Sequence, residues 1–187
     1  MSVLDKAITF AVQAHEGQFR KNEGMPFIMH PIEVAAIAST MTNNEETLAA
    51  AMLHDVIEDT QISVEIMEEM FGEDVLSLVL SETEEKYRNL PAEETWKRRK
   101  EESLNVLKSS TDRRVKILWV ADKLSNMRAF CRQYKRVGDE LWNSFNMKDK
   151  KLQHWYYSEV VRATEELKDY HAWQELKELT EFVFEHK

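Results

Sequence analysis

The sequence predicts an all-α protein, and two observations carry this prediction. Only four glycines and three prolines interrupt the 187 residues. Apolar residues recur mostly at intervals of three and four, which places them on one face of a helix, and no segment alternates as a half-buried strand would. We therefore expect residues 1–187 to form a single domain, a bundle of roughly eight to ten helices.

The composition is that of a globular protein, with 43% hydrophobic residues, 32% charged residues and a formal net charge of −9. This charge argues against a nucleic-acid partner, because nucleic-acid-binding faces cluster Lys and Arg against phosphates. It is compatible with a small anionic substrate, since a cation and a few basic side chains can make a positive pocket. No apolar run approaches the roughly 20 residues of a membrane span, so we expect no membrane partner.

The chain carries one cysteine, Cys131, which excludes an intrachain disulfide framework. The first residues, MSVLDKAITFAVQAHE, have neither a basic lead nor a small-residue cleavage site, and they are predicted to form the first helix. Both observations indicate a cytoplasmic protein.

Helix starts in the first half of the chain follow from residues whose side chains can cap a helix. Ser2 with Asp5, Asn44 and Ser63 each precede an apolar stripe of helical spacing. The predicted helices run from Ser2 to near Gly17, from Pro31 onward, from Asn44 onward, from Ser63 to Gly72, where the glycine can take the left-handed C-cap conformation, and from Glu73 to Ser81.

The second half begins with the most polar segment of the chain, residues 82–95, which is the best candidate for a mobile loop. Pro91 can open the next helix, and Asp112 can cap a long helix that stops at Gly138. Two further amphipathic helices are expected over residues 150–168 and 172–186, and we expect residues 139–187 to pack on the core.

The stretch HDVIEDT, from His54 to Thr60, concentrates one histidine and three carboxylates in seven residues. If this stretch is helical, His54 lies beside Glu58, and Asp55 lies beside both Glu58 and Asp59. These carboxylates would repel one another, and a cation would relieve the repulsion. Imidazole and carboxylate ligands suit Mn²⁺, Fe²⁺ or Zn²⁺, whereas the absence of paired cysteines argues against a structural zinc site.

A catalytic metal needs further ligands, and two residues elsewhere are candidates. His30 stands just before Pro31 at a loop-to-helix junction, and Asp122 interrupts an apolar helix face one turn before Asn126. Taken singly, a hydrogen-bonded histidine explains His30 better, and an ion pair or buried hydrogen bond explains Asp122 about as well. The joint pattern of His30, His54, Asp55 and Asp122 favours a metal site.

Three extended motifs between Ala14 and Arg128 carry a family resemblance: AHEGQFRKNEGMPFIMHPIEVA, LHDVIEDT and ADKLSNMR. They resemble the HD superfamily of metal-dependent phosphohydrolases, and more closely the hydrolase domain of the RelA/SpoT homologue family and its small alarmone hydrolases. The resemblance implies an all-α HD-domain fold. It also implies a manganese-dependent enzyme that removes the 3′-pyrophosphate of (p)ppGpp and yields GDP or GTP and pyrophosphate.

The resemblance also implies roles for residues of this chain. The metal, which the resemblance implies to be Mn²⁺, would be held by His30, His54, Asp55 and Asp122. The attacking water would be oriented or deprotonated by Glu58 and Asp59. The substrate contacts would be Arg20, suited to stack on the base, Lys21, and Asn126, suited to bond ribose or phosphate. Arg99 and Lys100 are candidate contacts to the outer phosphates, although a solvated basic helix face explains them equally well.

Departures from the family pattern leave the substrate open. Trp119 stands where bifunctional members usually have a lysine, Ala129 replaces a threonine, and SETEEKY replaces a GVTKL-like stretch. The alternatives are a phosphohydrolase acting on another phosphorylated nucleotide, such as NADPH or a nucleoside phosphate, and a non-catalytic nucleotide sensor. The pair Glu58 and Asp59 argues against a sensor, which needs no groups that act on water. The sequence leaves open whether the chain is a homo-oligomer.

Overall fold

A computed structural model describes residues 1–20, 24–87 and 89–185, and helices dominate this part of the chain. The α-helices are α1 (Val3–Ala14), α2 (Met29–Ala38), α3 (Glu45–Leu53), α4 (Val56–Asp59), α5 (Val64–Leu80), α6 (Ala92–Ser109), α7 (Arg113–Val137), α8 (Lys150–Ala163) and α9 (His171–Glu185). Two 3-10 helices, η1 (Gly138–Ser144) and η2 (Glu165–Leu167), lie between the last three of them. Within the described residues, β structure is limited to one bridge between Phe19 and Pro26. The prediction of an all-α fold is confirmed.

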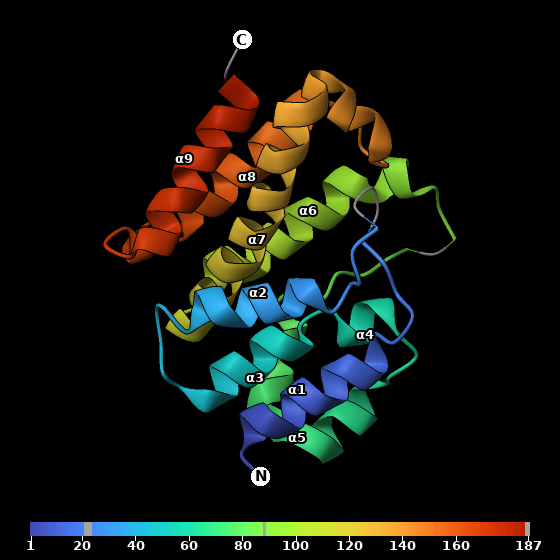
Figure 1. Cartoon of the computed structure of the whole chain (residues 1–187), viewed down its shortest axis with the longest axis vertical. Coiled ribbons are helices and arrows are strands. Elements are labelled where there is room, and N and C mark those ends of the chain that lie inside the picture. The colour runs from blue at the N-terminus through green and yellow to red at the C-terminus, as the bar shows by residue number, and fades with distance from the viewer. Residues whose placement is uncertain (21–23, 88, 186–187) are drawn as a thin grey trace.

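The helices gather in two groups that share α7 (Figure 1). Helices α1, α3, α4 and α5 lie at the end that holds the N-terminus, and α6, α8 and α9 lie at the end that holds the C-terminus. Helix α2 crosses between the groups and packs on both α3 and α7. Because α7 contacts helices of both groups, it places its own side chains at the junction between them.

The predicted capping residues act as caps in the structure. Ser2 and Asp5 form a reciprocal capping box on α1, and Asn44, Ser63 and Asp112 each accept a hydrogen bond from a first-turn N–H of α3, α5 and α7. Such caps each stabilise a helix by about 1 kcal/mol. They fix where these helices begin and so where their side chains point.

Helix α7 lies at the centre of the core, and its buried residues run from Val115 to Cys131. Trp119 is among the largest fully buried side chains, and its Nε1 donates to the carbonyl oxygen of Ser81 at 3.2 Å. Two polar residues of the same helix, Asp122 and Ser125, are also buried. Since buried polar groups need partners, these two residues mark the place where a site can form.

Several predicted helix boundaries are wrong by a few residues. Helix α1 ends at Ala14, before Gly17, and α2 begins at Met29, two residues before Pro31. A proline is tolerated in the first turn, because the N–H that it lacks would have no partner inside the helix. The predicted helix over 150–168 ends at Ala163 and is followed by η2.

The polar segment predicted over 82–95 is shorter in the structure. Helix α6 already begins at Ala92, with Pro91 in the N-cap position, so residues 81–91 connect α5 to α6. The acidic first turn of α6, with Glu93 and Glu94, favours an early start because carboxylates are stabilised at a helix N-terminus.

The HDVIEDT stretch does not form one continuous helix, which corrects the geometry expected for it. Helix α3 ends at Leu53 and α4 begins at Val56, so His54 and Asp55 lie at a bend between them. Asp55 has φ −95° and ψ −4°, in the bridge region where many active-site residues are found. The bend, rather than a shared helix face, sets the directions of His54 and Asp55.

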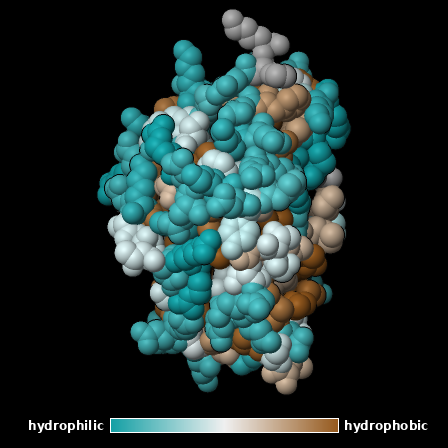
Figure 2. Space-filling model, turned by 90° about the vertical axis from the view of Figure 1, so that its left-hand side faces the viewer, coloured by the Kyte–Doolittle hydropathy of each residue, from teal (hydrophilic) through white to brown (hydrophobic). Residues whose placement is uncertain are grey.

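Hydrophilic side chains cover most of the face shown in Figure 2, and hydrophobic ones are scattered between them. Across the described residues, no helix combines the length and the apolar character that crossing a bilayer requires. The buried apolar residues come from every helix and both 3-10 helices.

Gly72 provides a test of the fold. It interrupts α5 with φ +81° and ψ 168°, a conformation almost restricted to glycine, although not the left-handed C-cap that the sequence suggested. A Cβ at this position would meet no atom within 4 Å, so Gly72→Ala should destabilise through backbone strain alone, by about 1–3 kcal/mol. Urea unfolding measures the change. Gly72→Asn should be destabilised as well, because asparagine tolerates the left-handed helical region but not the conformation that Gly72 adopts. If the free energy of unfolding of either variant equals that of the wild type within experimental error, the account is wrong.

Candidate metal centre and adjoining cavity

Four side chains from three parts of the fold converge at the junction of the two helix groups. His30 comes from α2, His54 and Asp55 from the bend before α4, and Asp122 from α7. The Nε2 atoms of His30 and His54 lie 3.3 Å apart. Asp122 Oδ1 lies 3.0 Å from His30 Nε2 and 3.6 Å from His54 Nε2, and Asp55 Oδ2 lies 3.6 Å and 3.1 Å from the same two atoms.

Hydrogen bonds on the far side of each imidazole fix which nitrogen faces the cluster. His54 Nδ1 lies 2.9 Å from the carbonyl oxygen of Ala51, which can only accept, so Nδ1 carries the proton. His30 Nδ1 lies 2.9 Å from Ser125 Oγ, and Ser125 donates its own proton to Glu33 Oε2 at 2.8 Å. His30 Nδ1 is therefore also the protonated nitrogen, and in the neutral imidazoles both Nε2 lone pairs point into the cluster.

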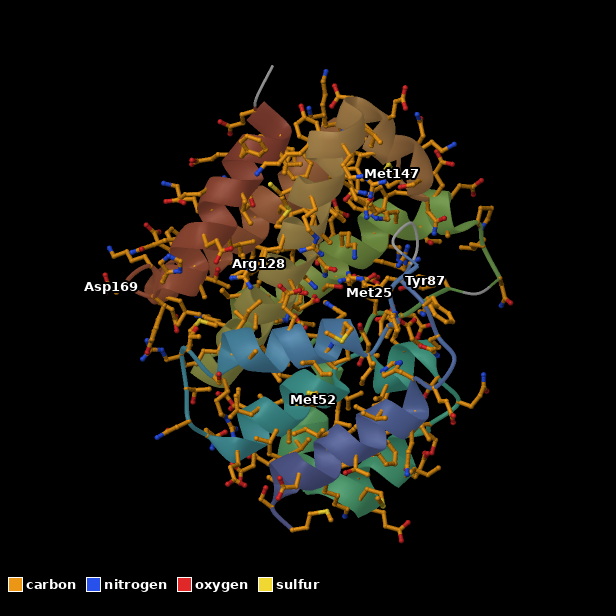
Figure 3. The ribbon with its side chains drawn as sticks, in the orientation of Figure 1. Met25, Met52, Tyr87, Arg128, Met147 and Asp169 are labelled. Carbon is orange, nitrogen blue, oxygen red and sulfur yellow. The ribbon has the colours of Figure 1, made fainter. Side chains whose placement is uncertain are left out.

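Glu33 extends this support to a second layer. Its Oε1 accepts from Arg128 Nη1 at 3.1 Å, and Arg128 (Figure 3) also donates to Glu175 of α9. The orientation of His30 is thus tied through Ser125 and Glu33 to the C-terminal helices. Partners of this kind orient metal-bound histidines in many proteins.

The distances within the cluster fit a divalent cation. Ligand bonds of about 2.1 Å to nitrogen and oxygen place neighbouring ligand atoms about 3.0–3.4 Å apart in octahedral or tetrahedral coordination. The two imidazole nitrogens lie 3.3 Å apart and each lies 3.0–3.6 Å from a carboxylate oxygen of Asp55 and of Asp122, and this mixture of ligands suits a borderline-hard metal. His30, His54 and Asp122 are all buried, so few waters can compensate the facing lone pairs and carboxylates.

The pKa values of the histidines and of Asp55 also indicate that the cluster favours a positive charge. Burial would lower the pKa of His54, but Asp55 and Asp122 outweigh burial and raise it well above its usual value. Burial does lower the pKa of His30. Burial would raise the pKa of Asp55, yet His54 beside it lowers the value to about 2. The ionised forms of Asp55 and Asp122 therefore favour positive charge on His54.

Glu58 and Asp59 follow the cluster on α4, and Lys86 from the segment 81–91 lies against both. Lys86 Nζ contacts Asp59 Oδ1 at 2.8 Å, the Glu58 carbonyl oxygen at 2.8 Å and Glu58 Oε1 at 3.5 Å. Burial, with the nearby Asp55 and Glu84 carboxylates, raises the pKa of Glu58. A carboxylate with a raised pKa binds a proton more readily than an ordinary carboxylate does.

The backbone of Asp59 is held by the first motif. Gln18 Nε2 donates to the Asp59 carbonyl oxygen at 2.9 Å, and Gln18 Oε1 lies 2.8 Å from His15 Nδ1. His15 is buried, and its ring packs against Phe27. These contacts join the end of α1 to the end of α4.

Arg20 and Asn126 connect the cluster to the space outside it. Asn126 Nδ2 donates to Asp122 Oδ1 at 2.8 Å, and Asn126 Oδ1 accepts from Arg20 Nη2 at 2.7 Å. The two predicted substrate contacts thus touch each other and one predicted ligand. Lys21, predicted beside them, lies outside the described residues.

Arg99 and Lys100 do not form a solvated basic face. Their side chains are only 12% and 19% exposed, and both form ion pairs with Glu84, at 2.8 Å and 2.6 Å. Burial would raise the pKa of Glu84, but Lys100 and Arg99 lower it. The two cations therefore point into the protein, toward the cluster.

Two cavities adjoin at this place. One, of about 230 Å³, is lined by the four predicted ligands with Glu58 and Asp59, and the other, of about 670 Å³, is lined by several aromatic and amide side chains. Six residues line both: Arg20, Phe27, Asp59, Arg99, Lys100 and Asn126. The larger cavity has the size of a pocket for a small molecule. Its wall includes Met147, labelled in Figure 3, and Tyr87 marks the segment 81–91 on the same side of that view.

Four charged residues at the site escaped the sequence analysis: Glu82, Glu84, Lys86 and Lys123. Three of them come from SETEEKY, which the sequence comparison treated only as a departure from the family pattern. A signal did exist, because only Ser81 separates Glu82 from the apolar run VLSLVL, and Lys123 follows Asp122. A charge at the end of a buried helix or beside a buried carboxylate needs a partner.

Glu82 is the least compensated of these groups. Its side chain is 3% exposed, its nearest cation is Lys123 Nζ at 3.8 Å, and within the described residues neither carboxylate oxygen has a hydrogen-bond partner. Burial raises its pKa to about 7, against the attraction of Lys123. Lys123 itself is held by Asp122 and lies 4.7 Å from the centre of the Trp119 ring.

Comparison with known proteins identifies the family. The HD domain family matches residues 7–149, and the chain belongs to this family. This assignment fits a divalent-metal site built from the His30, His54 and Asp122 cluster.

Solved structures agree along most of the chain. One, described as a metazoan ortholog of SpoT that hydrolyzes ppGpp, has 27% sequence identity and a TM-score of 0.74, and the match covers 96% of this chain and 94% of that one. The crystal structure of lmo0812 from Listeria monocytogenes EGD-e has 28% identity and a TM-score of 0.72, over 84% and 99% of the two chains.

Curated relatives are much longer proteins. The chain is 37% identical over 138 residues to a GTP pyrophosphokinase rsh of Brucella melitensis, a match of 73% of this chain and 18% of that protein. It is 40% identical over 128 residues to the bifunctional (p)ppGpp synthase/hydrolase SpoT of Escherichia coli K12, covering 67% and 18%. The chain thus spans less than a fifth of either relative.

The buried Glu82 predicts a pH-dependent gain in stability on substitution. Between its ordinary pKa of 4.5 and about 7, the folded state keeps a proton that the unfolded chain releases, so the free energy of unfolding falls as pH rises. Glu82→Gln has no carboxylate to ionise, so its free energy of unfolding should not fall in this way. Above about pH 7 the metal-free variant should be more stable than the wild type by at most about 3 kcal/mol. Urea unfolding in chelator near pH 5 and near pH 8 measures the difference. An equal effect at both pH values would contradict a titrating Glu82.

Proposed function

We propose that this chain hydrolyses the 3′-pyrophosphate of (p)ppGpp to GDP or GTP and pyrophosphate. The observation that carries the proposal is the cluster of two imidazoles and two carboxylates beside Glu58, opening on a cavity of nucleotide size. Substrate identity is supported by the ppGpp-hydrolysing structural neighbour, which matches nearly the whole chain. The SpoT relative supports it over the matched 67%.

His30, His54, Asp55 and Asp122 would hold the divalent cation, for which we propose Mn²⁺. A cation bound there supplies Lewis acidity, lowering the pKa of water and offsetting charge on a phosphoryl oxygen. The residues behind the cluster keep its ligand atoms in place. Ala51 and Ser125 fix the imidazole tautomers, and Asn126 holds Asp122 Oδ1.

Glu58 would accept the proton of the attacking water. Burial and neighbouring carboxylates raise its pKa, which brings the base closer to working pH. Asp59 would orient the same water. Its Oδ1 is paired with Lys86, and its carbonyl oxygen accepts a hydrogen bond from Gln18. Lys86 limits the negative charge that the two carboxylates present to an anionic substrate.

The nucleoside would occupy the larger cavity. Arg20 lines both cavities and offers a planar guanidinium on which a base can stack, while Asn126 stands between the cavities within reach of ribose or phosphate. Tyr156, Tyr157 and Phe145 add aromatic surface to the wall. Arg99 and Lys100, at the junction, would contact outer phosphates.

A substrate panel separates this proposal from its alternatives. The Mn²⁺-loaded protein is incubated with ppGpp, pppGpp, NADPH and common nucleoside phosphates, and pyrophosphate and phosphate are measured separately. The proposal expects pyrophosphate from ppGpp and pppGpp. Turnover of NADPH or a nucleoside phosphate alone would identify a different phosphohydrolase, and tight binding of ppGpp without product would identify a sensor.

Two substitutions should separate metal binding from proton transfer. Asp122→Asn replaces an anionic ligand by a neutral one and should weaken Mn²⁺ binding by at least about 100-fold, and turnover should fall with it. Glu58→Gln should leave Mn²⁺ affinity nearly unchanged and lower kcat about 10²–10⁴-fold, because it removes only the proton acceptor.

Calorimetric Mn²⁺ titration and initial rates on ppGpp measure the two effects on the same preparations. If Asp122→Asn keeps full metal content and rate, the ligand assignment is wrong. If Glu58→Gln loses metal together with activity, Glu58 is a ligand and not the base.

A further inference from the structure

Glu84 lies in the acidic segment that follows α5, and two cations hold its carboxylate. Oε2 accepts from Arg99 Nη1 at 2.8 Å, and Oε1 accepts from Lys100 Nζ at 2.6 Å. The side chain is 8% exposed. One carboxylate thus neutralises one of two positive charges that converge where the cavities meet, which leaves the pair with an excess of positive charge.

The two cations are organised independently of Glu84. Lys100 Nζ lies 4.7 Å from the centre of the Tyr156 ring, and Arg99 Nη2 lies 3.4 Å from the carbonyl oxygen of Ala92. Arg99 Nε is buried and, among the described residues, has no hydrogen-bond partner. Glu84 therefore leaves at least this one donor of the pair unpaired.

We infer that Arg99 and Lys100 form a phosphate-binding subsite whose resident occupant is the chain's own Glu84 carboxylate, and that a phosphate group of the ligand displaces Glu84. This inference deepens the proposed function and rests on it for the identity of the ligand, a nucleotide with an outer phosphate or pyrophosphate group. Glu84 thereby lowers the affinity of the site for every anion that must replace it.

The displacement needs little movement of the backbone. The Glu84 N–H donates to Glu58 Oε2 at 3.3 Å, and Lys86 two residues later binds the end of α4, so the segment is anchored by contacts that do not use the Glu84 carboxylate. Only side-chain rotation is required to release it. A phosphate group carries more charge and a third oxygen, so it makes more charge-assisted hydrogen bonds with the same cations.

The release would also change the surroundings of Glu58. The Glu84 carboxylate is one of the charges that raise the pKa of Glu58, after burial and Asp55. An anion that replaces Glu84 puts its own negative charge at the same place.

The test uses inorganic pyrophosphate as the probe and the full chain without metal, in chelator, followed by calorimetry. Glu84→Gln removes the resident charge and should bind pyrophosphate about tenfold more tightly than the wild type. Glu85→Gln is the matched control, because it makes the same change one residue later at an exposed position, and it should bind as the wild type does. In Glu84→Gln, the further change Lys100→Gln should abolish the gain, which locates the probe.

The opposite sign would overturn the inference. If Glu84 serves to hold Arg99 and Lys100 in position, Glu84→Gln binds pyrophosphate equally or more weakly than the wild type. Circular dichroism verifies that the variants are folded. Glu84→Asp, which keeps the charge but shortens its reach, provides a second variant and should show a smaller gain. Because no hydrolysis is measured, a protein that fails to hydrolyse ppGpp would still give a clear result here.

Discussion

The rest of the structure depends on the contact between His30 Nε2 and His54 Nε2, 3.3 Å apart and flanked by Asp55 and Asp122. Two lone pairs and two carboxylates facing one another are unfavourable unless a positive charge lies between them. The fold maintains this arrangement from three directions, with α2, the bend before α4, and α7. The hydrogen bonds to Ala51 and Ser125 also maintain this arrangement, because they keep the proton of each neutral imidazole on Nδ1. The other tautomer, with the proton on Nε2, would reduce the repulsion.

Negative and positive side chains occupy different places around the two histidines. Carboxylates surround the metal centre, and cations line the way from it to the larger cavity. Arg20, Arg99 and Lys100 belong to both cavity walls, so a chain with a net charge of −9 still presents a basic passage between its two cavities. Lys86 pairs with Asp59 and Lys123 pairs with Asp122, and these ion pairs reduce the repulsion between neighbouring carboxylates.

The sequence predicts those parts of the site that local spacing determines. The caps could be named because each precedes a stripe of apolar residues at helical spacing: Ser2, Asn44, Ser63 and Asp112. The candidate ligands could be named because together they form a pattern of imidazoles and carboxylates: His30, His54, Asp55 and Asp122. The bend at His54 and Asp55 could not, because only packing against α2 and α7 defines it. The contacts of Glu82, Glu84 and Lys86 were missed for a related reason: residues 81–91 have no helical period, and their partners lie on other elements.

The central claim is that the four converging side chains hold one divalent cation, and a crystal structure of the Mn²⁺-loaded protein tests it most directly. Anomalous diffraction at the manganese edge should show a peak at about 2.2 Å from Nε2 of both histidines and from a carboxylate oxygen of Asp55 and of Asp122. A cation bound instead by Glu58, Glu82 and Glu84, with the two imidazoles still facing each other, would contradict the account.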